Sequence, residues 1–182
     1  MSEDEQAPVN YNLTPWLSYG FYTAEDVDDI VANSAFPGKP EVLRKALLQG
    51  FAMKEEEAKE WPEVTDCDLL DAAFAELSSA GIIALHYAGW DNSDGIEEVD
   101  EERENRPDAV GYCFYHEQNI DAALDDMCFH LSFGALPRGD SDAAREVGEQ
   151  VVEALKMHGL RVEWDGSSET KIKLTRFVWL RR

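Results

Sequence analysis

The chain has 182 residues, with 38 acidic and 16 basic side chains, and its formal net charge is −22. A field of this sign repels phosphate backbones, so it excludes nucleic acid as an expected direct partner, whereas it would attract a basic protein. Hydrophobic residues make up 44% and aromatic residues 10% of the chain, which provides enough apolar surface for a core and argues against disorder.

The acidic charge is concentrated in the middle of the chain. Residues 61–126 hold 18 acids and 2 bases, whereas residues 127–182 hold 8 acids and 9 bases. Net charge governs solubility and association more than it marks a site, so solubility alone is an alternative explanation, and for the charge as a whole we favour it.

The sequence predicts a cytoplasmic protein that does not bind membranes. Its first ten residues, MSEDEQAPVN, lack the basic and apolar regions of a signal peptide. No run approaches the roughly 18 consecutive apolar residues of a membrane-spanning helix. The cysteines Cys67, Cys113 and Cys128 are an odd number without CxxC spacing, which favours reduced thiols. The oligomeric state is left open.

Helical patterns come first along the chain. A first helix starts at Thr23, which forms an imperfect capping box with Asp26. A second helix is predicted over residues 41–60, where leucines and a phenylalanine recur at every fourth position, and a third over residues 66–80.

Strand patterns dominate the rest of the chain. The predicted strands cover residues 82–87, 110–116, 127–133, 160–164 and 171–180, and two helices cover residues 119–126 and 141–158. This order favours an α+β fold, a mainly antiparallel sheet of about five strands with helices packed on one face, plus an N-terminal helical extension. We expect the extension at residues 1–65 and the α+β domain, as one compact unit, at residues 66–182.

Residues 90–107 form a long acidic connection between the first two predicted strands. The segment contains DNSDG and EEVDEERENR, and it is typical either of a solvated loop or of a short exposed helix.

Several elements resemble an uncharacterised bacterial family, a domain of unknown function. They are GYCFYHEQNIDAAL, LSFGA and GLRVEWDGSSETKI, with GIIALHYAGWDNSDG as a weaker one, and together they cover roughly residues 66–175. The chain departs from the family pattern at Asn119, where an acid is expected, and it carries helical sequence before residue 66 that the likeness does not cover. The resemblance supports the fold and implies no activity.

His116 and Glu117 are the candidate catalytic residues, because they lie between a predicted strand and a predicted helix. His116 would act as a general base, with Glu117 orienting it or acting as an acid. The structural alternative is that Glu117 complements the helix dipole and the His116 ring bonds to backbone, and we favour it.

Trp90, Asp91, Asp94, Glu97 and Glu98 form the start of the acidic connection. An EF-hand loop needs an acid at its first position, and aligning Gly95 with the invariant glycine puts Trp90 there, so no EF-hand is predicted. A looser oxygen site stays open, but a solvated acidic turn is the commoner arrangement.

Three histidines on predicted strands suggest a zinc site only in combination with a cysteine. These residues are His86, His116 and His130, with Cys113 or Cys128. Strand alternation places His116 and His130 among different neighbours, so we predict no metal. We also predict no cofactor, because no G-x-S-x-G, P-loop or GxGxxG motif occurs.

The last predicted strand has one basic and aromatic face. Lys171, Lys173, Phe177 and Trp179 alternate onto it. Such a face would bind an acidic or planar ligand, or its lysines would pair with acids of this chain, which we favour.

Two functional hypotheses follow. The first is a non-catalytic acidic module, inhibitor-like or immunity-like, that binds a basic protein through Trp90, Asp91, Asp94, Glu97, Glu98, Trp164 and Asp165. The second is an enzyme of unrecognised type that uses His116 and Glu117 in a cleft near the acidic segment and Trp164-Asp165. A deep pocket at His116 would favour the enzyme, whereas a shallow acidic face would favour the binding module, which we prefer.

Overall fold

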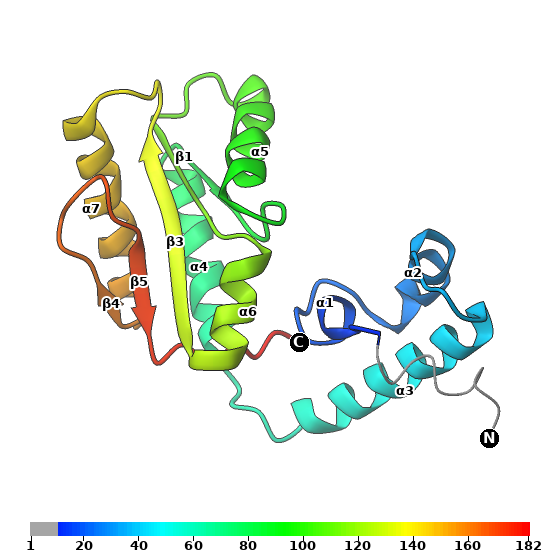
Figure 1. The fold of residues 1–182 in the computed structure, drawn as a ribbon. Coiled ribbons are helices and arrows are strands. Elements are labelled where there is room, and N and C mark those ends of the chain that lie inside the picture. Colours follow the sequence, from blue (N-terminus) through cyan, green and yellow to red (C-terminus); the bar gives the residue numbers. More distant parts are fainter. Residues whose placement is uncertain (1–10) are drawn as a thin grey trace. The chain divides into compact units, whose positions relative to one another are not determined.

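The computed structural model describes residues 11–182 (Figure 1). The chain divides into two compact units: the first runs to Glu63 and includes Leu180–Arg182, and the second is Val64–Trp179. No helix within the described range is both long and apolar enough to cross a lipid bilayer.

The first unit is helical. It contains α1 (Thr14–Leu17), the 3-10 helix η3 (Ala24–Asp26), α2 (Val27–Asn33) and α3 (Pro40–Ala58). The capping box predicted at Thr23 forms, since the carboxylate of Asp26 accepts the backbone N–H of Thr23 at 2.7 Å. The core of the unit consists of residues from α2 and α3, namely Val27, Ile30, Leu43, Leu47 and Phe51.

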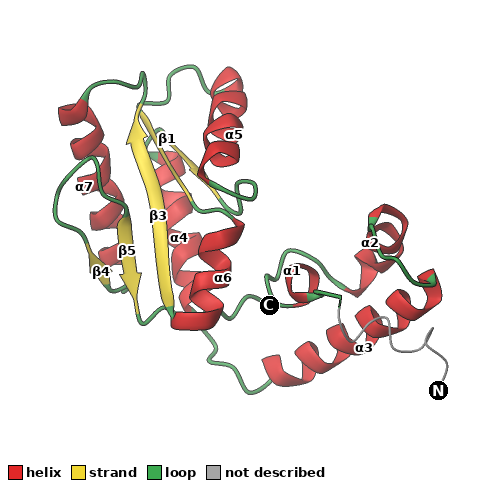
Figure 2. Ribbon diagram, in the orientation of Figure 1, coloured by secondary structure: helices red, strands yellow, loops and turns green. Residues whose placement is uncertain are grey.

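The second unit holds a five-stranded sheet with the order β1-β2-β3-β5-β4 (Figure 2). The strands are β1 (Ile82–Leu85), β2 (Gly111–Phe114), β3 (Cys128–Ala135), β4 (Val162–Glu163) and β5 (Ile172–Thr175). The helices are α4 (Asp66–Ser79), α5 (Asn92–Asn105), α6 (Glu117–Asp126) and α7 (Ser141–Met157). β1 and β2 are parallel and the other neighbouring pairs are antiparallel. The prediction of an α+β fold with a mainly antiparallel sheet of five strands is confirmed.

Helices pack on both faces of this sheet, so the expectation of helices on one face is wrong. A side chain at Gly111 would collide with Val147 of α7, whereas one at Gly95 of α5 would collide with the ring of Phe114. Positions 111 and 114 of β2 point to opposite faces, because side chains alternate along a strand. The parallel pair β1–β2 needs a crossover connection, and α5 is that connection, which is why it covers the face that α7 leaves free.

The acidic connection is helical over most of its length, which excludes the solvated loop of the two alternatives. The carboxylate of Asp91 caps α5 by accepting the backbone N–H groups of Ser93 and Asp94 at 2.7 and 3.2 Å. Gly95 and Val99 are one turn apart and buried, so they fasten this otherwise polar helix to the sheet.

The last strand is shorter than predicted, and its basic and aromatic face does not exist. β5 ends at Thr175, and Arg176 has a left-handed backbone with φ of 55° that interrupts the alternation. Phe177 and Trp179 then turn into the core, where they are 1% and 5% exposed and pack against Phe129. The predicted face fails because strand alternation holds only while the backbone stays extended.

Candidate functional site

The loops after the parallel strands β1 and β2 are joined at the end of the sheet where α5 and α6 begin. The backbone N–H of Ala88 donates to the carbonyl of Tyr115 at 2.8 Å, and that of Glu117 donates to the carbonyl of Gly89 at 3.0 Å. The sequence-predicted residues Trp90–Glu98 and His116–Glu117 therefore meet at one end of the sheet. The carboxyl end of parallel strands is where α/β sheets commonly bind ligands.

His116 is buried at this end and takes the N-cap position of α6. It is 3% exposed, and its backbone N–H donates to Oδ1 of Asn119 at 3.0 Å. Its ring faces the first turn of α6 in a capping box, yet Nδ1 completes no hydrogen bond with any described residue. Nε2 lies 3.5 Å from Nζ of Lys171. The structural alternative, in which the His116 ring bonds to backbone, is thus not supported, because the backbone N–H of His116, and not its ring, makes the hydrogen bond to Asn119 in the cap.

The environment of His116 favours the neutral form of its imidazole. Burial lowers the pKa of His116, and the positive charge of Lys171 lowers it further. Asp91 and Asp94 raise the pKa of His116, but they do not reverse the net direction. Burial also lowers the pKa of Lys171.

Ser132 and Asn92 form a further contact at this end of the sheet that the sequence does not predict, and the sequence does not place Lys171 beside His116 either. The hydroxyl of Ser132 on β3 donates to Oδ1 of Asn92 at the start of α5, at 2.7 Å. Ser132 lies opposite Phe114, two residues before His116, in the β2–β3 register. The alternation of polar residues along β3 places Ser132 on its polar face, but the strand pairing that brings it to Asn92 is not visible in the sequence.

Glu117 braces the loop rather than the histidine. Its carboxylate accepts the hydroxyl of Tyr87 at 2.8 Å, and Tyr87 has a left-handed φ of 53°. Since Nδ1 of His116 has no hydrogen-bond partner among residues 11–182 and Nε2 faces Lys171, Glu117 does not orient the imidazole in the predicted way.

The acids at the start of α5 differ in their contacts and in their exposure to solvent. Asp91 caps the helix, and Asp94 accepts the backbone N–H of Trp90 at 2.9 Å, which positions an indole that is 59% exposed. Glu97 is exposed to solvent. Partial burial raises the pKa of Glu98, and the neighbouring charge of Glu101 raises it further.

The histidines and cysteines considered from the sequence as zinc ligands do not come together as a metal site in the described residues. Over residues 11–182, no three histidine, cysteine, aspartate or glutamate side chains come together in a way that would hold a metal ion. Nδ1 of His86 instead lies 2.9 Å from the hydroxyl of Tyr115. Cys113 is fully buried, which raises the pKa of its thiol.

Trp164 and Asp165 lie apart from the other predicted binding residues. The Trp164 ring packs edge-on against Phe133 with 5.4 Å between centroids, and it also faces Gly148 of α7. Asp165 closes the β4–β5 turn by accepting the hydroxyl of Thr170 at 2.5 Å, which lowers its pKa. The sheet thus separates Trp164, on the α7 face, from α5 on the other face.

Comparison with known proteins reveals one family. The model of a family described as a domain of unknown function, DUF6891, matches residues 2–182. The chain belongs to this family. No curated protein and no solved structure matches it.

The DUF6891 match also corrects the extent of the resemblance seen in the sequence. Because the matched region starts at residue 2, the helical sequence before residue 66 is part of the family and not an addition to it. Membership of this family, a domain of unknown function, implies no activity for the chain.

Proposed function

We propose that this DUF6891 protein is a non-catalytic module that binds a basic protein through α5. The observation that carries the proposal is the crowding of carboxylates on this one helix. Asp94, Glu97, Glu98, Asp100, Glu101, Glu102 and Glu104 all belong to it, and Arg103 is its only basic residue. Burial raises the pKa of Glu98, and the charge of Glu101 raises it further, which means that these two carboxylates repel each other in the free protein.

The fold presents these acids as a preformed surface. Gly95 and Val99 are buried against the sheet and Ile96 packs beside them, so the opposite side of α5 faces solvent. Glu97, Glu101 and Glu104 are exposed. A basic partner would relieve the repulsion between them, and its lysines and arginines would be steered toward the helix by the negative field.

Trp90 adds an apolar contact beside this surface. Its indole is 59% exposed, and its backbone is tied to Asp94 on the first turn of α5. Exposed tryptophans contribute strongly to protein interfaces when a partner buries them. Trp90 and the exposed face of α5 together form the proposed docking surface.

An enzyme that uses His116 is the second candidate. The observation in its favour is a buried imidazole whose Nδ1 has no hydrogen-bond partner among the described residues, next to a lysine amine at 3.5 Å. It is supported less well, because a ring that is 3% exposed would reach a substrate only after the surrounding loops moved.

Partner capture with two matched triple variants tests the proposal. Glu97, Glu101 and Glu104 are changed to Gln in one, and Glu146, Glu149 and Glu153 of α7 in the other; both sets are exposed helix glutamates on opposite sides of the sheet. Tagged protein is used to isolate partners from the native host, and they are identified by mass spectrometry. We expect basic partners that the α5 variant loses, that the α7 variant keeps, and that rising salt releases. Equal capture by both variants would remove α5 from the argument.

A further inference from the structure

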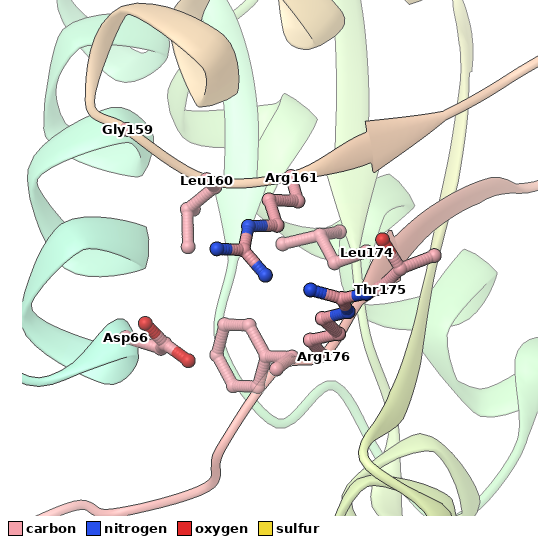
Figure 3. Close-up of a pocket in the computed structure, with 8 residues that line it drawn as sticks. Asp66, Gly159, Leu160, Arg161, Leu174, Thr175 and Arg176 are labelled. Atoms are coloured by element: carbon pink, nitrogen blue, oxygen red, sulfur yellow. The ribbon is translucent and has the colours of Figure 1, made fainter.

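A second feature of the α+β unit points to an anion-binding pocket that is separate from α5. The pocket has a volume of about 210 Å³ and lies where α4 begins, α7 ends and β5 ends. Figure 3 shows the side chains of Arg161 and Arg176 converging in it, with Asp66 facing them from the start of α4. None of the residues that line it belongs to α5.

The two arginines carry charge that the chain does not neutralise. Neither guanidinium takes part in an ion pair or hydrogen bond with any residue in the described range 11–182. This is unusual for a chain with a net charge of −22, in which acids outnumber bases by 38 to 16. Two cations that share a small cavity repel each other, and an anion between them would turn this repulsion into attraction.

The one acid in the pocket is held away from the arginines by another contact. Oδ2 of Asp66 accepts the backbone N–H of Val178 at 2.8 Å. Asp66 therefore stabilises the segment that follows β5, and its carboxylate forms no ion pair of 4.0 Å or less with either arginine in the described structure.

The backbone holds both arginines in place. The carbonyl of Arg161 accepts the N–H of Thr175 at 3.0 Å, so Arg161 is tied to the end of β5 directly before Arg176. Arg176 has a left-handed φ of 55°, a conformation that non-glycine residues adopt rarely and that is concentrated at ligand-binding sites. The N–H of Phe177 donates to the carbonyl of Met127 at 3.1 Å and fixes the chain just after this residue.

We propose that Arg161 and Arg176 bind a phosphate or phosphomonoester group. Each guanidinium offers parallel N–H donors that match two oxygens of one anion, and phosphate has enough oxygens for two guanidinium groups, whereas a carboxylate has only two oxygens in all. Both arginines are exposed residues, so an anion can reach them from solvent. If the two guanidinium groups share one oxygen, three oxygens are bound and the fourth is free to carry a substituent.

The test is titration of the full chain with inorganic phosphate at constant ionic strength, followed by calorimetry and by backbone amide NMR. We expect saturable binding of one phosphate, with the largest shifts at Gly159 and Thr175. Arg161→Gln and Arg176→Asn should each raise the Kd about tenfold or more, because each removes a charge-assisted bidentate contact. Asn is chosen at position 176 because it tolerates a left-handed backbone, which protects the fold.

Two further variants make the outcome specific. Arg145→Gln removes the same charge from α7, where Arg145 lies near Glu149, and it should leave the Kd unchanged within about twofold. Asp66→Asn keeps an acceptor for Val178 but removes the opposing charge, so it should tighten phosphate binding. An unsaturated titration, an equal loss in Arg145→Gln, or weaker binding by Asp66→Asn would each overturn the proposal.

Methyl phosphate distinguishes the two sources of the group. Binding as tight as that of inorganic phosphate would identify a phosphomonoester as the ligand, whereas markedly weaker binding would identify the free anion. If neither probe binds, the pocket is not a phosphate site. Loss of the α5-dependent partner would not affect any of these results, since the pocket and the docking surface share no residue.

Discussion

The hydroxyl of Tyr87 donates to the carboxylate of Glu117 with 2.8 Å between the two oxygen atoms, and this bond crosses from the loop after β1 to the start of α6. The backbone of Tyr87 is left-handed, and the backbone N–H of Glu117 donates a second hydrogen bond between the two loops, to the carbonyl of Gly89. The two loops that position Trp90 and His116 are therefore one hydrogen-bonded structure.

Tyr87→Phe tests this connection. We expect the free energy of unfolding to fall by about 1 kcal/mol, since a partly buried hydrogen bond to a carboxylate is lost. Glu117→Gln should cost less, because the amide oxygen still accepts the tyrosine hydroxyl. Urea unfolding monitored by circular dichroism measures both values. An unchanged Tyr87→Phe variant would show that the loops are held by their backbone bonds alone.

Val151→Asp tests the packing of α7. Val151 is fully buried, and an unpaired charge there should lower the free energy of unfolding by about 3 kcal/mol or more. Val152→Asp is the control, because Val152 is only half-buried and the new carboxylate can reach water. Similar thermal midpoints for the two variants would contradict this account of the core.

Gly95→Ala tests how closely α5 approaches the sheet. The new methyl group would collide with the ring of Phe114, so the helix should shift and the free energy of unfolding should fall by about 1–3 kcal/mol. Glu97→Ala on the exposed side of the same helix should change it by less than about 0.5 kcal/mol. Chemical denaturation of both variants decides the matter, and a stable Gly95→Ala protein would mean that the helix can move without cost.

His116 gives the stability a defined pH dependence. The pKa of His116 is lowered in the folded protein, so below the unfolded value of about 6.5 the unfolded chain binds more protons than the folded protein. The free energy of unfolding therefore falls as the pH falls. Above that value the stability associated with the neutral histidine is fully present. His116→Asn, which keeps a good N-cap residue, should weaken the decline in stability below about pH 6.5.

Unfolding free energies of wild type and His116→Asn across this pH range test the prediction. His130, whose pKa is lowered by burial and by Lys173 and Lys171, accounts for part of the remaining decline. His130→Asn should therefore remove a further part of it. A pH profile that is identical for wild type and His116→Asn would show that the histidine titrates as it does in the unfolded chain.

Much of the fold could be predicted from local pattern. Alternation predicts all five strands, and a four-residue repeat predicts α3, because burial of one face imposes those periods. The ends were less accurate: the last strand was extended to residue 180 because nothing in the local pattern marks the left-handed turn at Arg176. The acidic segment was ambiguous because only Gly95 and Val99 mark its buried side.

The chemistry of the unit depends on contacts between residues far apart in the chain. Sequence alone determined the acidity of the middle third, the α+β class and the candidate residues His116 and Glu117. Only the tertiary structure brought Lys171 to His116 across 55 positions, placed Trp164 on the opposite face from α5, and aimed Arg161 and Arg176 into one pocket. Strand order and register decide such meetings, and they arise from the packing of the whole sheet, which a local sequence pattern does not encode.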